Sequence, residues 1–275
     1  MKGNPIPFAE EKYYIAKVDT FTETVYCHHD HMGELQIPLH SHKKAQFLYV
    51  EGGVIHVQTT KQTYFLPARH FMWIPAGVEH SIHTNSEKAI MRNLYFPVAP
   101  FKQLEDLVEG IYPASDLVLE LLLFTDRWQG NISPTVPYFS VIEALRYIVA
   151  EIAPKSLSHS VPIPTEVRLI KIIDYMQDNL SDNLQYQEIC ARFGYTERSL
   201  HRLFKKDLGM SFMQYFTLRR MLKAVEYLIE NKLSIKEIAQ LVGYSSIPTF
   251  SNTFFKTMGQ RPSDYIRGCR LPSAS

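Results

Sequence analysis

The residues best placed to do chemistry in this 275-residue chain are basic side chains near position 200. Arg198 and Arg202 are four residues apart, so on a helix they share one face, where each guanidinium can bond both acceptors of a guanine. His201 points outward in the same helical phase. Lys205 and Lys206 follow, where ammonium groups can neutralise phosphates. The spacing indicates a helix that contacts double-stranded DNA; the plainer alternative is a solvated surface.

The helix that carries these residues belongs to a unit that occurs twice. Ile189–Tyr195 matches Ile238–Tyr244, and Arg202–Gly209 matches Asn252–Gly259. In each unit a short helix ends at a glycine, which allows positive φ, and a Thr or Ser caps a longer helix. This is the order of a helix-turn-helix, whose second helix lies in the major groove. The alternative, a helical bundle with a coincidental repeat, does not explain the matching glycines and caps.

A long helix joins the two units. Ser211 and Gln214 have the spacing of a capping box, which predicts a helix from there to about Glu230. A helix of ~20 residues is ~30 Å long, close to the ~34 Å between successive major grooves on one face of DNA. One chain can therefore contact two adjacent grooves.

The segment from about Thr165 to Arg267 resembles the DNA-binding domain of AraC-type regulators. Its most specific stretches are three: Ile235–Ser246, Phe250–Ser251 and Gly259–Tyr265. The resemblance implies sequence-specific DNA binding by paired helix-turn-helix units. It also implies base contacts at Arg198, His201 and Arg202.

The second recognition helix departs from the family pattern. Ile247, Pro248 and Asn252 stand where the family often has polar or basic residues. Asn252 can still read adenine, and Ile247 can contact a thymine methyl group. The alternative is a weaker contact directed at the DNA backbone, made by Thr249, Ser251 and Lys256.

The first hundred residues have a different character. From Gln36 to Phe96, short runs rich in β-branched and aromatic residues alternate with turns such as Gly52–Gly53 and Pro75–Gly77. Many short strands at this spacing predict a small β-barrel or sandwich.

Histidines stand near two of these turns. His40 and His42, followed by Gln46, and a Pro-Ala-Gly run ending at His80 resemble the two short motifs of the cupin barrel. The resemblance implies a divalent metal ion, such as Zn²⁺, Ni²⁺ or Fe²⁺, bound by the three histidines. Gln46 takes the place of the family's Glu, and Arg69 that of a glycine. A neutral amide is a poorer ligand, so the alternative is a sensor barrel in which these residues only form hydrogen bonds.

The same barrel is the expected site of a small-molecule effector, because barrel mouths commonly bind ligands. We expect Gln46, Tyr49 and Trp73 to line it together with the histidines. Phe47 and Phe71, offset by strand alternation, are expected to pack outside against helices.

Composition divides the chain in the same way. Residues 165–270 hold 16 Lys and Arg against 11 Asp and Glu, whereas the rest is acidic. A basic part beside an acidic part fits a polyanion-binding module attached to another domain. The predicted segments are a cupin-like barrel (1–100), a helical connecting section (101–152), a linker rich in Pro and Ser (153–164) and the DNA-binding domain (165–270).

These observations predict an α+β protein of two domains, a small β-barrel with a helical section and an all-α domain. Three widely spaced cysteines and the absence of a ~20-residue apolar run indicate a cytoplasmic protein outside the membrane. The apolar stripe of Tyr138–Ile152 fits a homodimer contact or a cover for the barrel. We therefore expect a ligand-responsive transcription regulator without enzyme activity. The alternative is a metal-dependent cupin enzyme, an oxygenase or isomerase, fused to a helical domain.

Overall fold

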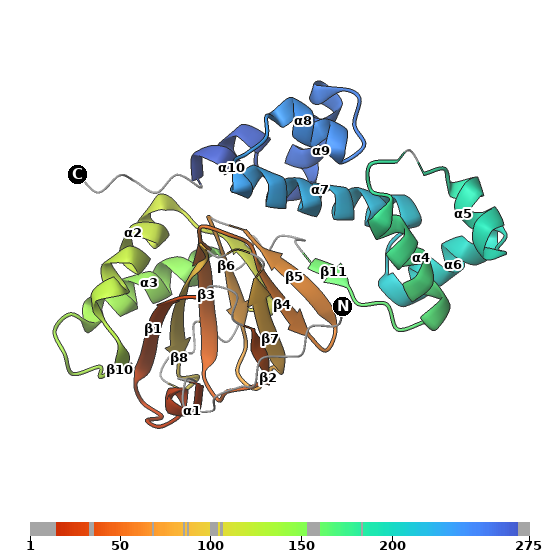
Figure 1. Ribbon diagram of the computed structural model, residues 1–275. Coiled ribbons are helices and arrows are strands. Elements are labelled where there is room, and N and C mark those ends of the chain that lie inside the picture. The colour runs from red at the N-terminus through yellow and green to blue at the C-terminus, as the bar shows by residue number, and fades with distance from the viewer. Residues whose placement is uncertain are drawn as a thin grey trace.

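A computed structural model describes residues 15–32, 36–67, 69–84, 86, 88–99, 104, 107–152, 160–182 and 184–268. It has a β-rich half followed by a helical half, as Figure 1 shows. The predicted α+β fold with two parts is confirmed. None of the helices that the structure describes is long and apolar enough to cross a membrane.

The β-rich half contains two antiparallel sheets. One sheet has the strand order β10 (Gly130–Ile132), β1 (Val25–His31), β8 (Ile90–Phe96), β3 (Ala45–Glu51), β6 (His70–Ile74) and β9 (Gly110–Pro113). The other has the order β11 (Ser160–Pro162), β5 (Gln62–Leu66), β4 (Ile55–Thr59), β7 (His80–Thr84) and β2 (Ile37–His40). A short helix, α1 (Ile15–Val18), precedes β1.

Apolar side chains form one core cluster from strands of both sheets. Leu48 and Val50 of β3 belong to it together with Ile55, Val57 and Ile82 of the other sheet. Successive strand residues point to opposite faces, so the intervening residues of β3 point the other way. Two apolar layers therefore lie on the two faces of the six-stranded sheet.

The outer face of that sheet is covered by α2 (Asp116–Phe124), the short 3₁₀ helix η3 (Thr125–Arg127) and α3 (Phe139–Ile152). Phe47 and Phe71 pack here with stacked rings 4.5 Å apart, as predicted. The buried stripe of α3 contains Ile142, Leu145 and Val149, whereas Ala144 is exposed. The stripe thus faces the barrel, which is the second of the two roles expected for it.

The section predicted as helical also contributes strands. β10 and β9 form the two edges of the six-stranded sheet. In β9, Ile111 packs in the inner apolar layer and Tyr112 in the outer one. The predicted linker is also partly a strand. Its residues Ser160–Pro162 form β11, which pairs with β5 and buries Val161. Residues 153–159 of that linker lie outside the described residues.

The helical half consists of α4 (Val167–Asp178), α5 (Tyr186–Phe193), α6 (Glu197–Leu208), α7 (Phe212–Glu230), α8 (Ile235–Leu241), α9 (Ile247–Met258) and α10 (Pro262–Gly268). Figure 1 shows α5–α6 and α8–α9 near opposite ends of α7. Helix α7 lies along the five-stranded sheet, since Val54, Phe65 and Val161 share one apolar cluster with the helices. The Arg219 guanidinium lies 5.6 Å from the Phe65 ring centroid. The helices are therefore docked on the barrel.

Candidate DNA interface and metal site

The first helix-turn-helix unit consists of α5, a turn and α6. Helix α5 ends at Gly194, whose φ is 71°. Thr196 caps α6, and its side-chain oxygen accepts a hydrogen bond from the Ser199 backbone N–H over 3.2 Å. Leu200 and Phe204 are fully buried. This phase fixes the outer face of α6.

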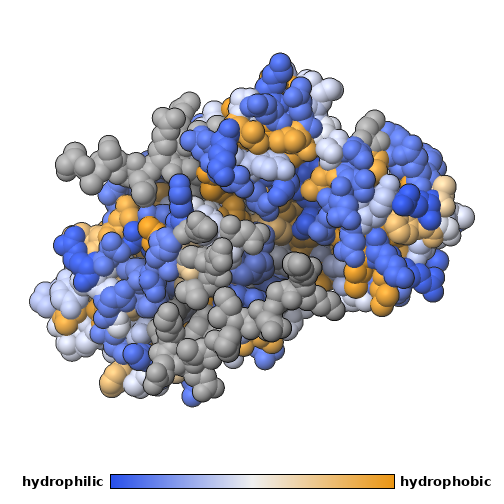
Figure 2. Space-filling model, in the orientation of Figure 1, coloured by the Kyte–Doolittle hydropathy of each residue, from blue (hydrophilic) through white to orange (hydrophobic). Residues whose placement is uncertain are grey.

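Five predicted contact residues share that outer face. They are Arg198, His201, Arg202, Lys205 and Lys206, and all five are exposed. None of them forms an ion pair with a residue that the structure describes. Figure 2 shows hydrophilic side chains over much of the visible surface of the helical units. Their cations are available for phosphates and bases.

The second unit repeats this geometry with different chemistry. Ser246 caps α9, and its hydroxyl also receives a hydrogen bond from Thr249 Oγ1 over 3.1 Å. Asn252 is exposed, but its Oδ1 accepts a hydrogen bond from Arg261 over 3.3 Å. The predicted contact residues Ile247, Thr249, Asn252 and Lys256 are exposed and Ser251 is half-buried. Lys256 is therefore the one cation among these five predicted positions.

In the barrel, the three predicted histidines converge. The rings of His40 and His80 are 4.2 Å apart, and those of His42 and His80 are 5.2 Å apart. One nitrogen from each lies within 4.8 Å of the other two. His40 is the last residue of β2 and His42 lies in the turn after it, so the two histidines do not share a strand. The turn, rather than strand alternation, brings them together.

Backbone carbonyls orient all three rings. Nδ1 of His40, His42 and His80 donates a hydrogen bond to the carbonyl of Pro38, Lys44 and Val78, respectively. A carbonyl only accepts, so each Nδ1 carries the proton, and in neutral imidazole Nε2 keeps its lone pair. Burial lowers the pKa of all three, and the nearby His40 adds to the effect on His80, whose pKa falls to about 3. The rings are neutral, as metal ligands require.

Gln46 completes the set. Its Oε1 lies 3.1 Å from Nε2 of His42 and 3.1 Å from Nε2 of His80. Its Nε2 donates to Asn93 Oδ1 over 2.7 Å, which aims the oxygen at the histidines. Four acceptor atoms, the three histidine Nε2 atoms and Oε1 of Gln46, then face one point, and none of them carries a proton. A divalent cation fits this donor set, with second-shell hydrogen bonds of the usual kind.

Two predicted effector residues do not reach this group. Tyr49 and Trp73 are buried in the layer beneath α2 and α3, on the opposite face of the six-stranded sheet from Gln46. Tyr49 is three residues from Gln46, and Trp73 is paired with Phe47, so both must point outward. Their expected place beside the histidines is wrong.

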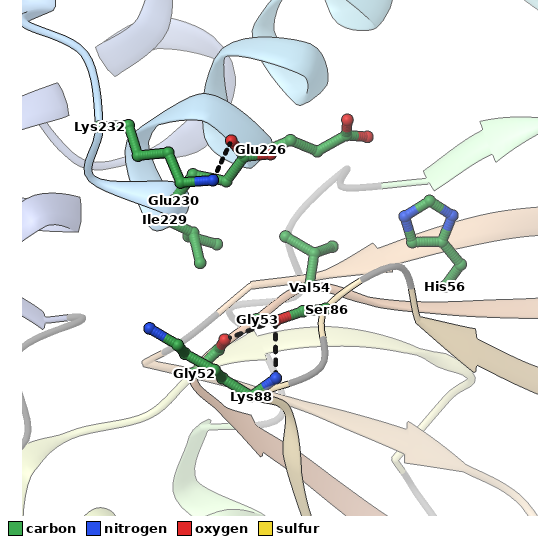
Figure 3. Close-up of a pocket in the computed structure, with 10 residues that line it drawn as sticks. All are labelled: Gly52, Gly53, Val54, His56, Ser86, Lys88, Glu226, Ile229, Glu230 and Lys232. Carbon is green, nitrogen blue, oxygen red and sulfur yellow. Dashed lines mark hydrogen bonds and ion pairs between the residues drawn. The ribbon is translucent and has the colours of Figure 1, made fainter. Parts of the chain in front are cut away.

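A cleft that the sequence did not predict lies between the two halves (Figure 3). Its volume is about 480 Å³. The barrel contributes the turn Gly52–Val54, His56, Ser86 and Lys88, and the end of α7 contributes Glu226, Ile229, Glu230 and the following Lys232. Residues far apart in the chain line it, so no local pattern predicts it.

Comparison with known proteins matches both halves. The cupin domain family matches residues 29–95, and the helix-turn-helix domain family matches residues 189–268. The HTH-type transcriptional regulator NimR of Escherichia coli is 25% identical over 252 residues, which cover 91% of this chain and 89% of that protein. The HTH-type transcriptional activator RhaS of Yersinia pestis is 34% identical over 99 residues, 36% of each protein.

Among solved structures, a transcriptional regulator from Chromobacterium violaceum with an AraC-type DNA-binding domain is similar. It is 28% identical, with a TM-score of 0.36, and the match covers 38% of this chain and 95% of that one. The matches to the two domain families, in the same order as the barrel and the paired units, are the decisive finding. The chain carries a cupin domain followed by a helix-turn-helix domain, and it is similar to transcription regulators with an AraC-type DNA-binding domain.

Proposed function

We propose that this protein is a cytoplasmic, homodimeric transcription regulator whose DNA binding is controlled by a divalent metal ion, or a small molecule, at the histidine group of its barrel. The observation that carries the proposal is the convergence of four acceptors, the Nε2 atoms of His40, His42 and His80 and Oε1 of Gln46. A metal ion bound there supplies positive charge and open coordination positions for a ligand.

The amide of Gln46 makes this site suited to reversible occupancy. A half-turn of the amide, with a matching half-turn of the Asn93 amide, would point its NH₂ group at the lone pairs of His42 and His80, so that these two nitrogens are satisfied without an ion. Nε2 of His40 is buried and has no partner among the described residues. A carboxylate at position 46 could not donate in this way. The neutral amide therefore favours a site that gains and loses its ion, as a sensor requires, over a permanent centre.

Helix α7 is the element through which the barrel can influence DNA binding. Strand β7 begins with His80 on the side of the metal group, and it carries His83, which meets His56 with rings 4.7 Å apart. His56 lies in the cleft that α7 borders. Burial and then the nearby His83, Arg219 and Lys223 lower the pKa of His56 to about 4, so it is neutral near pH 7. Strand β7 thus carries a residue of the metal group and reaches the cleft beside the docked helix through His56 of β4.

At the DNA, we assign base contacts to Arg198, His201 and Arg202. Lys205 and Lys206 bind phosphates beside them. Helix α9 positions the second unit chiefly through the DNA backbone, because Thr249 serves the helix cap and Asn252 is held by Arg261.

For the homodimer we assign the outer surface of α2 and α3. Its exposed apolar side chains are Leu117, Phe124, Tyr138 and Tyr147. The buried stripe of α3 is occupied by the barrel, which leaves this outer surface for a second copy.

Metal content and DNA affinity measured together test the proposal. The full chain is stripped with EDTA and titrated with Zn²⁺, Ni²⁺ or Fe²⁺, and its affinity is measured on duplexes that it selects from a random pool. We expect a change in affinity with metal that His80→Ala abolishes. His83→Ala, on the same strand but beside His56, should keep the metal. If only Gln46→Glu binds metal while the parent purifies empty and responds to none, metal sensing is contradicted.

A further inference from the structure

Arg220 is a buried arginine in the middle of α7, on a helix face that is otherwise apolar. Only 9% of its surface is exposed. Phe216, one turn earlier on α7, is buried too. The Arg220 guanidinium lies 4.2 Å from the centroid of the Phe216 ring. A buried guanidinium must have its donors satisfied or it destabilises the fold. Its hydrogen-bond partners therefore say what it does.

Two donors of Arg220 bind the loop that leads into the first unit. Nε donates to the carbonyl of Leu180 over 2.8 Å, and Nη2 donates to the carbonyl of Asp182 over 2.6 Å. These carbonyls lie in the loop between α4 and α5, outside both helices. The planar guanidinium holds both in a fixed geometry.

Aromatic rings extend this contact into the first unit. Phe216 stacks on Phe212 at 5.8 Å. Phe212 contacts Tyr186 of α5 at 5.2 Å and Phe204 of α6 at 5.7 Å. Arg220 is thus packed against the core beneath the first recognition helix.

The other side of Arg220 faces the second unit. Its guanidinium carbon lies 5.6 Å from the Tyr244 ring centroid. Tyr244 contacts Phe250 of α9 at 5.8 Å. At Gly243, a Cβ would lie 2.7 Å from the guanidinium carbon and 2.9 Å from the Ser181 carbonyl oxygen. The turn of the second unit therefore packs directly against Arg220 and against the loop to which Arg220 is hydrogen-bonded.

The matching glycine of the first unit has no such neighbour. Gly194 and Gly243 have similar φ values, 71° and 80°. A Cβ at Gly194 would meet nothing within 4 Å. The helix-turn-helix fold alone does not require a crowded glycine, so the crowding at Gly243 belongs to the junction between the units.

We propose that Arg220 is a positioning residue that locks the two helix-turn-helix units in one relative orientation. The inference rests on the proposal that both units bind DNA at once. Each added base pair rotates the second site by about 34–36° around the duplex, so a rigid junction accepts one spacing between half-sites. A loosened junction should accept several spacings but bind the best one less tightly, because the effective concentration of the second unit falls.

The orientation can be measured without DNA. Nitroxide labels are placed at Ala191→Cys on α5 and Gln240→Cys on α8, both exposed, in the full chain carrying Cys269→Ser. Cys27 and Cys190 are buried and do not label readily. We expect a narrow distance distribution by electron double resonance in the parent and a broad one in Arg220→Met. Gly243→Ala should shift or broaden it, whereas Gly194→Ala, with the same backbone strain, should leave it narrow.

The consequence for DNA is measured on duplexes selected by the parent, with the spacer between half-sites lengthened or shortened by one base pair. The parent should lose about tenfold or more in affinity for a changed spacer. Arg220→Met should lose about tenfold at the selected spacing and show little further dependence on the spacer. On duplexes that keep only the first half-site, Arg220→Met and the parent should bind equally.

The outcomes separate the two proposals. If the parent selects no duplex, DNA recognition by both units fails, and the distance distributions still test the lock. If Arg220→Met keeps a narrow distribution and the parental spacer dependence, the lock is refuted. Should Arg220→Met fail to fold, Arg220→Lys decides in its place, because a lysine keeps the charge but cannot hold both carbonyls in the same fork.

Discussion

The two helix-turn-helix units share a backbone and differ on their outer faces. Both second helices have a hydroxyl residue at the N-cap and end at a glycine with φ of 71°. Helix α6 then exposes two arginines, a histidine and two lysines, whereas the corresponding residues of α9 are mostly neutral. The repeat keeps what folding requires and varies what touches DNA. We therefore expect base reading to be concentrated in the first unit, and the second unit to set the register.

The largest difference between the two units is expected in the stability that each loses when its turn glycine is replaced by alanine. Gly194→Ala should lower the free energy of unfolding by about 1–2 kcal/mol, because an alanine is strained at positive φ. Gly243→Ala should cost about 3 kcal/mol or more, since overpacking against Arg220 and Ser181 is added. Denaturant melts of the full chain measure both. Equal losses would remove the contrast between the two turns.

A smaller difference is expected at the bases. Arg202→Ala should weaken binding to a selected duplex by ~1–3 kcal/mol and relax the preference at one base pair. Asn252→Ala should cost less than about 1 kcal/mol, since Arg261 already engages its oxygen. Repeating the selection with each variant gives the measurement. If both variants lose affinity equally for every sequence, neither residue reads a base.

The smallest effect on DNA binding is expected from replacing one lysine in each unit, and this effect should be the same in both units. Lys206→Ala and Lys256→Ala should each reduce the slope of log affinity against log salt by about 0.9. Neither should change which sequence is preferred, because phosphates carry no sequence. Salt titrations on the selected and on a scrambled duplex provide the comparison. An altered preference in Lys256→Ala would give α9 the base-reading role that we assign to α6.

Local signals in the sequence were sufficient for most of the helical half. The capping boxes at Ser211 and Ser234 are both present, and Gly194, Gly209 and Gly259 end their helices with positive φ. Each of these signals acts within a few residues, so it can be read without the rest of the chain. The convergence of His40, His42 and His80 is also confirmed, but it depends on the pairing of β2 with β7, which sets His40 opposite His80. The resemblance to the two cupin motifs, rather than a local signal, indicated it.

Predictions that depended on distant partners did less well. Tyr49 and Trp73 lie two residues from Phe47 and Phe71 on the same strands, so side-chain alternation places them on the outer face with these two residues, away from Gln46. The pairing of β11 with β5 joins residues about a hundred positions apart, and three residues carry no pattern that predicts it. Arg220 left one signal, a charge on the apolar face of α7, but only the contacts identify its partners.

Strand β11 has a consequence for how far the DNA-binding helices can travel. Four residues, 163–166, separate Pro162 of β11 from the start of α4. While β11 stays paired with β5, these four residues let the start of α4 move at most about 14 Å from the end of β11. The barrel therefore keeps the helices that follow at a high local concentration. A movement of the helices away from the barrel by more than this distance would first have to break the pairing of β11 with β5.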